Sequence, residues 1–331
     1  MTFKTKKMYT RLALVLSLSA VFPAVAQDAQ SGEKSDELDP RIKEEIAYVE
    51  ALVYAGFPRF AETVIAETKK KWPESEALFF AIEIRNLLQL GKDEEVNRMI
   101  AALPDRKGSK YWAARLEVAL DHNNRSRKEQ SLEEFDDFFK NNANPPKELR
   151  ELVRTAHWAR AQIYTSMKRY HDAAKDCEAI MADLAKLKDK DEDLANNWCA
   201  CACEAADLYL RVASEIPNVK DRKKDLDSAK KIISQLLWMR DKYVYFGRAI
   251  AMKAHLEFLS GRLDRSQGVI DDYMTDLADI HDQLEKADPD GRYGLLKLSP
   301  MPQCRYLLAD MLWKEAQKKS KGLKDLSKVK G

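Results

Sequence analysis

The sequence predicts an all-α protein in which pairs of antiparallel helices repeat along the chain as an open arc, a helical-hairpin solenoid. Apolar residues recur at steps of three and four through almost all of the 331 residues. Runs of alternating Val, Ile and Thr bounded by turn dipeptides are nearly missing, so strands have little support. Gly56 and Gly91 lie 35 residues apart, each between two amphipathic stretches, and this period is typical of repeated helical hairpins.

The first 26 residues have the layout of a cleaved secretory signal. Four basic side chains stand within the first eleven residues, an apolar run covers residues 12–22, and small residues at Ala24 and Ala26 precede Gln27. A membrane-spanning helix needs about 20 apolar residues, so a retained signal anchor is the less favoured alternative. We therefore predict a signal peptide over 1–26, export to the periplasm or the extracellular space, and no integral membrane segment after cleavage.

The charge balance gives no electrostatic reason to expect nucleic acid as a partner. The chain has 56 Lys+Arg against 54 Asp+Glu, and residues 1–26 hold four of the basic residues and no acidic one. The remainder is close to neutral with its charges interspersed, whereas a nucleic-acid surface needs a clustered basic face. Residues 314–331 are the local exception, with seven lysines and two acids. A solvated helix end is favoured there over a membrane or polyanion contact.

The first hairpin follows a polar leader. Residues 27–39 are polar and aperiodic, which predicts disorder. Asp39 can cap a helix that has Pro40 at its first position, and Gly56 ends that helix. A second amphipathic stretch then runs to the residue before Pro73.

The same pattern continues to about residue 286, giving about six hairpins. The hairpin over 111–140 lacks clear small residues, and the loops near Asn218 and Asp290 are longer than the others. A further first helix is expected over residues 303–319, with too little chain after it to complete a hairpin. We expect that end to fray unless another chain or further sequence completes it. The predicted divisions are a signal peptide (1–26), a polar leader (27–39), a repeat domain (40–316) and a lysine-rich tail or incomplete repeat (317–331).

Three stretches carry a resemblance to a known repeat family. The best is "HWARAQIYTSMKRYHDAAKDCEAI", which has small Ala161, aromatic Tyr164, Tyr170 and small Ala173, with Cys177 where a larger aromatic is commoner. The stretches "AGFPRFAETVIAETKKKWP" and "FLSGRLDRSQGVIDDY" supply small residues and glycines at similar intervals. These units resemble the tetratricopeptide repeat family. The resemblance implies a superhelix whose first helices line a concave groove that holds a peptide or a protein.

The groove of that family is lined by first-helix residues that lie outside the packing signature. A mixture of charged, amide and aromatic side chains at such positions suits an extended peptide, although the same residues also suit a solvated surface. The resemblance implies that the following residues bind the partner: Glu50, Tyr54, Arg85, Gln89, Trp158, Gln162, Arg248 and His255.

No motif of catalysis, metal binding or cofactor binding is present in the sequence. The five histidines are scattered, and no H-E-x-x-H, G-x-S-x-G, P-loop or G-x-G-x-x-G occurs. The prediction is a non-catalytic binding protein with no cofactor. The alternative is an enzyme or glycan-binding protein of the cell envelope built as an α/α toroid, with a carboxylate pair and aromatic platforms. Few glycines and short loops argue against that alternative. The oligomeric state is open.

The stretch "NNWCACACEAADLYL" is the sharpest chemical feature. It falls on a predicted helix over 191–214, where Cys199 and Cys203 share a face and Cys201 points about 200° away. Cysteines four apart on a helix are too distant for a disulfide, and no C-x-x-C or neighbouring histidine completes a zinc site. Close helix packing is therefore the favoured role.

A disulfide between Cys177 and Cys203 remains an open, less favoured alternative. The turn between their helices is predicted near residue 190, so each cysteine lies thirteen positions from it and the two are level on antiparallel neighbours. Export favours oxidation, but helix axes about 8–10 Å apart often hold the Cβ atoms too far apart.

Overall fold

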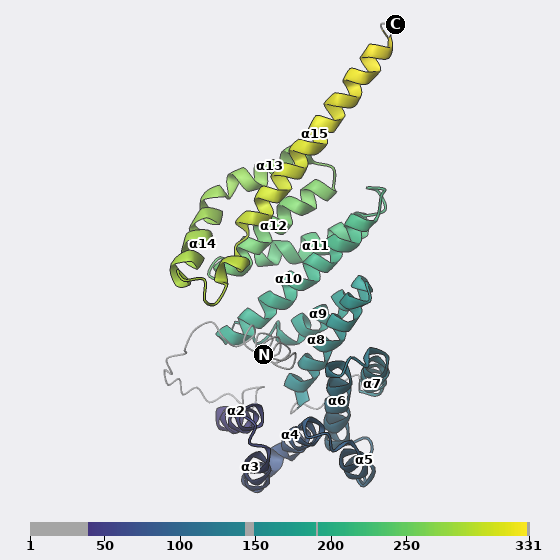
Figure 1. The fold of residues 1–331 in the computed structure, drawn as a ribbon, viewed down its shortest axis with the longest axis vertical. Coiled ribbons are helices and arrows are strands. Elements are labelled where there is room, and N and C mark those ends of the chain that lie inside the picture. The colour runs from purple at the N-terminus through teal and green to yellow at the C-terminus, as the bar shows by residue number, and fades with distance from the viewer. Residues whose placement is uncertain (1–38, 143–148, 190, 330–331) are drawn as a thin grey trace, which may run out of the picture. The chain divides into compact units, whose positions relative to one another are not determined.

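The computed structural model describes residues 39–142, 149–189 and 191–329. Within them it contains fourteen α-helices and two short 3-10 helices and no strand, so the predicted all-α class is confirmed (Figure 1). The predicted signal peptide and all but the last residue of the predicted leader lie outside the described residues. The chain divides into two compact units. The N-terminal unit ends at Met167, and the C-terminal unit begins at Lys168.

Each helix of the N-terminal unit packs on neighbours one or two positions along the chain. The pairs that contact most are α4 with α6, and α6 with α7. Helices α2 and α3 also contact each other, and both contact α4. The elements are α2 (Pro40–Tyr54), α3 (Pro58–Lys71), η1 (Pro73–Ser75), α4 (Glu76–Gln89), α5 (Asp93–Ala101), α6 (Ser109–Asn124), α7 (Lys128–Asn141) and α8 (Arg150–Ser166).

The C-terminal unit is built around two central helices. Helix α10 packs on α9, α11 and α12, and α12 packs on α11, α13, α14 and α15. Helix α10 matches the predicted cysteine-bearing helix over 191–214 within one residue. The elements are α9 (Tyr170–Leu184), α10 (Glu192–Glu215), α11 (Lys223–Leu236), α12 (Tyr243–Leu259), α13 (Leu263–Asp272), α14 (Met274–Ala287), η3 (Leu295–Leu298) and α15 (Met301–Val329).

The first helix begins as the sequence predicts. The Oδ1 atom of Asp39 accepts a hydrogen bond from the backbone N–H of Arg41 at 2.9 Å, and Pro40 occupies the first helical position. A backbone N–H at the first helical position has no acceptor within the helix. Proline, which has no N–H, therefore costs no hydrogen bond at this position. The predicted cap is confirmed.

Five hairpins close through a turn of three residues. In each turn the middle residue has a positive φ, the left-handed conformation that glycine adopts without steric cost. The residues are Gly56 (φ 81°), Gly91 (φ 74°), Ser126 (φ 64°), Lys168 (φ 59°) and Gly261 (φ 75°). The first three are spaced by 35 residues, so Ser126 continues the period that the two glycines begin.

Two hydrogen bonds close four of these turns in the same way. At Gly91, the N–H of the glycine donates to the carbonyl of Leu88 and the N–H of Lys92 donates to that of Leu87, both at 3.0 Å. This pair of bonds is the Schellman motif, which satisfies carbonyls that a helix end leaves open. The turns at Gly56, Ser126 and Gly261 repeat it.

A buried residue of the second helix lies five positions after each left-handed residue. At two of these positions a serine hydroxyl bonds the facing backbone, since Ser131 donates to the carbonyl of Ala119 and Ser266 to that of Ala254, both at 2.7 Å. The hairpin over 111–140 thus has its small residue in Ser131, contrary to the sequence interpretation. The five buried residues are Ala61, Val96, Ser131, Ala173 and Ser266.

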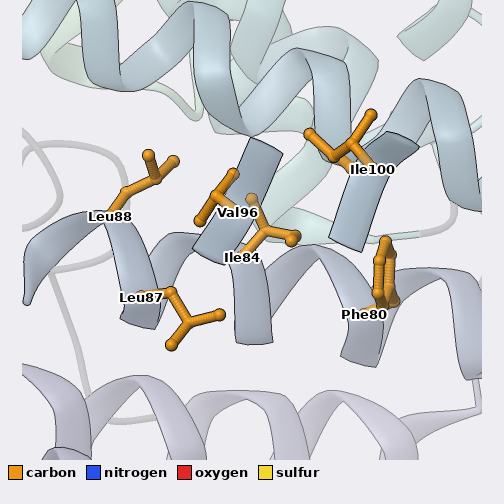
Figure 2. Close-up of a cluster of buried hydrophobic side chains, with 7 residues drawn as sticks. Phe80, Ile84, Leu87, Leu88, Val96 and Ile100 are labelled. Carbon is orange, nitrogen blue, oxygen red and sulfur yellow. The ribbon is translucent and has the colours of Figure 1, made fainter. Parts of the chain in front are cut away.

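The apolar core of the N-terminal unit lies between first and second helices. Figure 2 shows Phe80 and Ile84 of α4 pointing toward Ile100 and Val96 of α5, and Ala114 of α6 completes the cluster. A second cluster joins α2, α3 and α4. The apolar residues that recur at steps of three and four in the sequence are therefore the ones buried between these helices.

The C-terminal end consists of two shorter helices and one long helix. Helix α13 ends at Asp272, and α14 follows after Tyr273 as a separate helix. Helix α15 runs to Val329 and includes most of the segment predicted as a tail. The longer loops predicted near Asn218 and Asp290 are present, at residues 216–222 and 288–300.

Candidate functional site

The structure brings two of the predicted groove residues of the N-terminal unit together. Arg85 of α4 forms an ion pair through Nη1 with Glu50 of α2. Gln89, the last residue of α4, is exposed. Tyr54 ends α2, and its side chain lies outside the described part of the structure.

Arg85 has a second partner that the sequence interpretation missed. Its Nε and Nη2 atoms donate to the two carboxylate oxygens of Glu117 on α6, at 2.9 and 2.6 Å. Glu117 is 2% exposed. Burial alone would lower the pKa of Arg85, but Glu117 and then Glu50 raise it well above its ordinary value. The guanidinium is fully engaged and links three first helices, so it serves packing rather than a ligand.

The remaining predicted residues of this unit lie on α8. Trp158 is half-buried and Gln162 is exposed. Beside them, the ring of Phe139 stacks on His157 with centroids 4.0 Å apart, and the guanidinium of Arg160 lies 4.2 Å from its centre. The aromatic ring of Phe139 is thus already in contact with both His157 and Arg160.

The two predicted residues of the C-terminal unit both lie on α12. Arg248 and His255 are half-buried, and each interacts electrostatically with a carboxylate of α10. His255 interacts with Asp207, and Arg248 interacts with Glu204. Burial lowers the pKa of His255, and the charge of Lys314 on α15 acts in the same direction.

Three polar groups between α10 and α12 are uncommitted. Glu204, Tyr245 and Arg248 are half-buried, and none forms a side-chain hydrogen bond or ion pair with a residue of the described chain. Burial, and secondarily Asp207, raises the pKa of Glu204. Burial raises the pKa of Tyr245 to about 12, with the nearby thiols of Cys203 and Cys199 adding to the effect. These groups can accept and donate hydrogen bonds to a molecule that covers them.

The neighbouring acid on α10 is already engaged. Asp207 pairs with Arg211 one turn further along the helix, with Nε and Oδ2 2.7 Å apart. The uncommitted groups of Glu204, Tyr245 and Arg248, called the α10–α12 cluster below, are therefore the strongest candidate site among the residues that the structure describes.

The cysteines are all buried, and Cys177, Cys199, Cys203 and Cys304 are free thiols. The thiol of Cys177 lies near Cys201, and the thiol of Cys199 lies near Cys203. The predicted opposite faces of α10 are thus observed. Burial raises the pKa of Cys199 to about 12 and that of Cys203 to about 11, so these thiols are poor nucleophiles at neutral pH.

The register between α9 and α10 explains why Cys203 is not the neighbour of Cys177. The turn covers residues 185–191, so its centre lies near residue 188 and not near residue 190. Cys177 lies eleven positions before that centre, so the level position on α10 is residue 199 and not residue 203. Among the cysteines there, Cys201 lies toward α9, whereas Cys203 lies toward Arg248 of α12.

Within residues 39–142, 149–189 and 191–329, no three His, Cys, Asp or Glu side chains are grouped as a metal site. No helix of this part combines the length and apolarity that a membrane crossing needs. An open pocket of about 610 Å³ lies where the α12–α13 turn faces α15. Its lining consists of Gly261, Arg262, Leu263, Asp264, Arg265, Glu315 and Lys319.

No protein-family profile, curated protein or solved structure matches this chain.

Proposed function

We propose that the chain is an exported, non-catalytic helical-repeat scaffold of the tetratricopeptide type, which binds an extended peptide or a protein through the exposed faces of its first helices. The proposal is supported by five three-residue turns of one conformation and by the 35-residue spacing of the first three. Buried residues at a constant offset from these turns, four of the five being Ala or Ser, are also typical of repeated hairpins.

The α10–α12 cluster is the observation that carries the binding role. A half-buried arginine without a carboxylate partner loses water without gaining a charged hydrogen bond. A carboxylate of a bound peptide would supply that bond, and Arg248 presents its donors in a fork that suits one. Glu204 and the hydroxyl group of Tyr245 would accept from or donate to peptide amides beside it. A peptide offers both kinds of group in one molecule.

The comparison with Arg85 shows why the C-terminal unit is favoured as the binding unit. Arg85 has the same chemistry and a similar place on a first helix, but Glu117 and Glu50 satisfy it. Displacing those carboxylates would leave a buried charge unpaired, at a cost of several kcal/mol. Arg248 needs no such displacement.

The test begins with capture of partners from the envelope fraction of the native cell, followed by titration of the captured peptide or protein against purified variants. Arg248→Met is expected to weaken binding by about ten- to a hundredfold, the value of a hydrogen bond to a charged group. Glu204→Gln should weaken it less, because an amide still accepts one bond. Arg292→Met, at an exposed loop arginine, is the matched control.

Equal affinity of the wild-type protein and Arg248→Met for every captured partner would contradict the proposal. Sequencing of the N-terminus of the native protein tests the export part separately, with Gln27 as the expected first residue. Turnover of a glycan by the purified protein would favour the toroid enzyme instead.

A further inference from the structure

Helix α15 has two apolar faces, and only one of them is covered. Cys304, Leu307 and Met311 are buried against the helices of the C-terminal unit. On the opposite side Tyr306 is 79% exposed and Trp313 is 61% exposed. At 100° per residue, positions 306, 309, 313 and 316 of a helix share one side. Ala309 and Ala316 are also exposed, so they complete an apolar stripe, which Leu312 borders at 67% exposed.

Beyond this stripe α15 continues to Val329 as a lysine-rich helix. Figure 1 shows α15 extending well past the other helices of the C-terminal unit. Seven lysines and two acids occur from residue 314 to residue 331, in a chain whose whole composition is close to neutral. Lys314 rests on the ring of Phe258 at 3.7 Å and pairs with Asp310 at 3.4 Å, and Lys319 is exposed. Large exposed aromatic side chains thus adjoin a concentrated positive charge.

We infer that α15 lays its exposed apolar stripe, made of Tyr306, Ala309, Leu312, Trp313 and Ala316, on the surface of a membrane that contains anionic lipid. Trp and Tyr side chains are preferred at the level of the lipid headgroups, because one part of each ring system is apolar and another donates a hydrogen bond. Lysines near the surface are attracted to anionic headgroups by about 1 kcal/mol each. An exposed apolar stripe next to a basic segment is the arrangement of helices that lie in the plane of a membrane.

The charge decides this occupant over a second copy of the chain. A parallel pairing of two α15 helices would bring the lysine-rich segments together, and like charges in contact oppose binding. An antiparallel pairing would bury the aromatic side chains but leave the lysines without partners. Only an anionic surface satisfies both features of the helix.

The test measures binding of the purified full chain to lipid vesicles by flotation. Vesicles of phosphatidylcholine alone are compared with vesicles of equimolar phosphatidylglycerol and phosphatidylcholine. We expect binding to the anionic vesicles and a steep decrease of binding with salt, because salt screens the lysines. Binding to both kinds of vesicle with equal affinity, or to neither, would overturn the inference.

Two sets of variants separate the aromatic and the electrostatic contributions. Tyr306→Ser with Trp313→Ser is expected to weaken binding by about tenfold or more, since burying a large apolar side chain contributes about 1.5–3 kcal/mol. Lys321→Gln with Lys324→Gln and Lys328→Gln should weaken it by about a hundredfold, at about fivefold for each lysine. The helix content and thermal midpoint of both variants are measured beside wild type, and those of the aromatic variant should stay unchanged, since Tyr306 and Trp313 are exposed.

Matched controls exist in the same unit. Trp238, at the end of α11, is 87% exposed, and Trp238→Ser should leave vesicle binding unchanged. Lys220→Gln with Lys223→Gln and Lys224→Gln removes three exposed lysines elsewhere and should change it far less. A control variant that binds anionic vesicles as weakly as the α15 variants do would overturn the inference.

If a different molecule covers the apolar stripe of α15, the same experiments give different results. A dimer in sedimentation velocity that Trp313→Ser dissociates, together with no vesicle binding, would replace the membrane by a second copy. Binding of polyglutamate that is tighter than binding to vesicles and independent of Trp313 would replace it by an acidic protein.

Discussion

Arg85 is the charge partner of a buried carboxylate in the N-terminal unit. Its loss would leave the carboxylate of Glu117 buried without a charge partner. We expect Arg85→Met to lower the free energy of unfolding by about 3–5 kcal/mol, and the double variant Arg85→Met with Glu117→Leu to recover most of that loss. Urea unfolding followed by circular dichroism measures both. Arg98→Met, at an exposed arginine of α5, is the control. An equal loss of unfolding free energy in Arg85→Met and Arg98→Met would refute the prediction.

Asp288 organises the loop between α14 and α15. Its carboxylate accepts backbone N–H bonds from Tyr293 at 3.1 Å and Leu295 at 3.0 Å. Burial acts to raise its pKa, but these backbone donors outweigh it and hold the pKa below its ordinary value. A carboxyl with a lowered pKa contributes stability at pH values above its unfolded pKa of about 3.9, and that stability is lost as the pH falls through the lowered value.

We therefore expect Asp288→Asn to lower the thermal midpoint of the protein at neutral pH. The difference between variant and wild type should shrink as the pH falls below about 4. A series of thermal melts across that range measures it, with Asp290→Asn, an exposed neighbour, as control. A difference that stays constant with pH would show that the carboxylate charge has no part in the loop.

At the scale of elements, the turns at Ser126 and Lys168 are strained where the three turns with a central glycine are not. Ser126 has φ 64°, in a region that costs an L-residue about 1 kcal/mol and glycine almost nothing. We expect Ser126→Gly to raise the free energy of unfolding by up to about 1 kcal/mol. Ser126→Ala keeps the strain and should bring no gain. Urea midpoints distinguish the two, and a loss of stability in Ser126→Gly would contradict the shared turn geometry.

The sequence predicted the helices well where a residue type has one common structural meaning. Asp39 before Pro40, and Gly56, Gly91 and Gly261, mark helix ends that the structure confirms. Ser126 and Lys168 could not be recognised, because neither residue type signals a left-handed conformation. A shift of about two residues in one turn was enough to change the neighbour of Cys177.

The candidate site was only partly predictable for a related reason. The spacing of 35 residues between Glu50 and Arg85 placed both on successive first helices, and they do meet. Glu117 was missed because it lies 32 residues after Arg85, one helical turn from the equivalent position. Whether a first-helix residue such as Arg248 finds a partner depends on its neighbours on α10, which no pattern within α12 encodes.

On the scale of the whole molecule, each unit contains a half-buried histidine whose pKa is lowered. Burial is the main cause for His122 in the N-terminal unit and for His255 in the C-terminal unit, and nearby Arg127 adds to it for His122. A base with a lowered folded pKa stays neutral in the folded state while the unfolded chain takes up a proton. Stability is then complete above the unfolded pKa of about 6.5 and decreases as the pH falls toward the lowered values.

We expect the free energy of unfolding of the full chain to fall between pH 6.5 and the lowered pKa values. The double variant His122→Gln with His255→Gln should show a flatter dependence. Urea unfolding at a series of pH values measures the slope. His157→Gln is a control of the same type at a stacked histidine, and an unchanged slope in the double variant would assign the pH dependence to other groups.

The three-residue turns restrict where the chain can change in length. Five hairpins share this turn, and hydrogen bonds at fixed offsets close four of them, so an added residue would break the helix end that they form. The connections from one hairpin to the next are longer, with seven residues at 102–108 and at 185–191 and six at 237–242. Natural insertions, and an inserted epitope or fluorescent peptide, should therefore be accepted at the hairpin-to-hairpin connections and rejected at the hairpin tips.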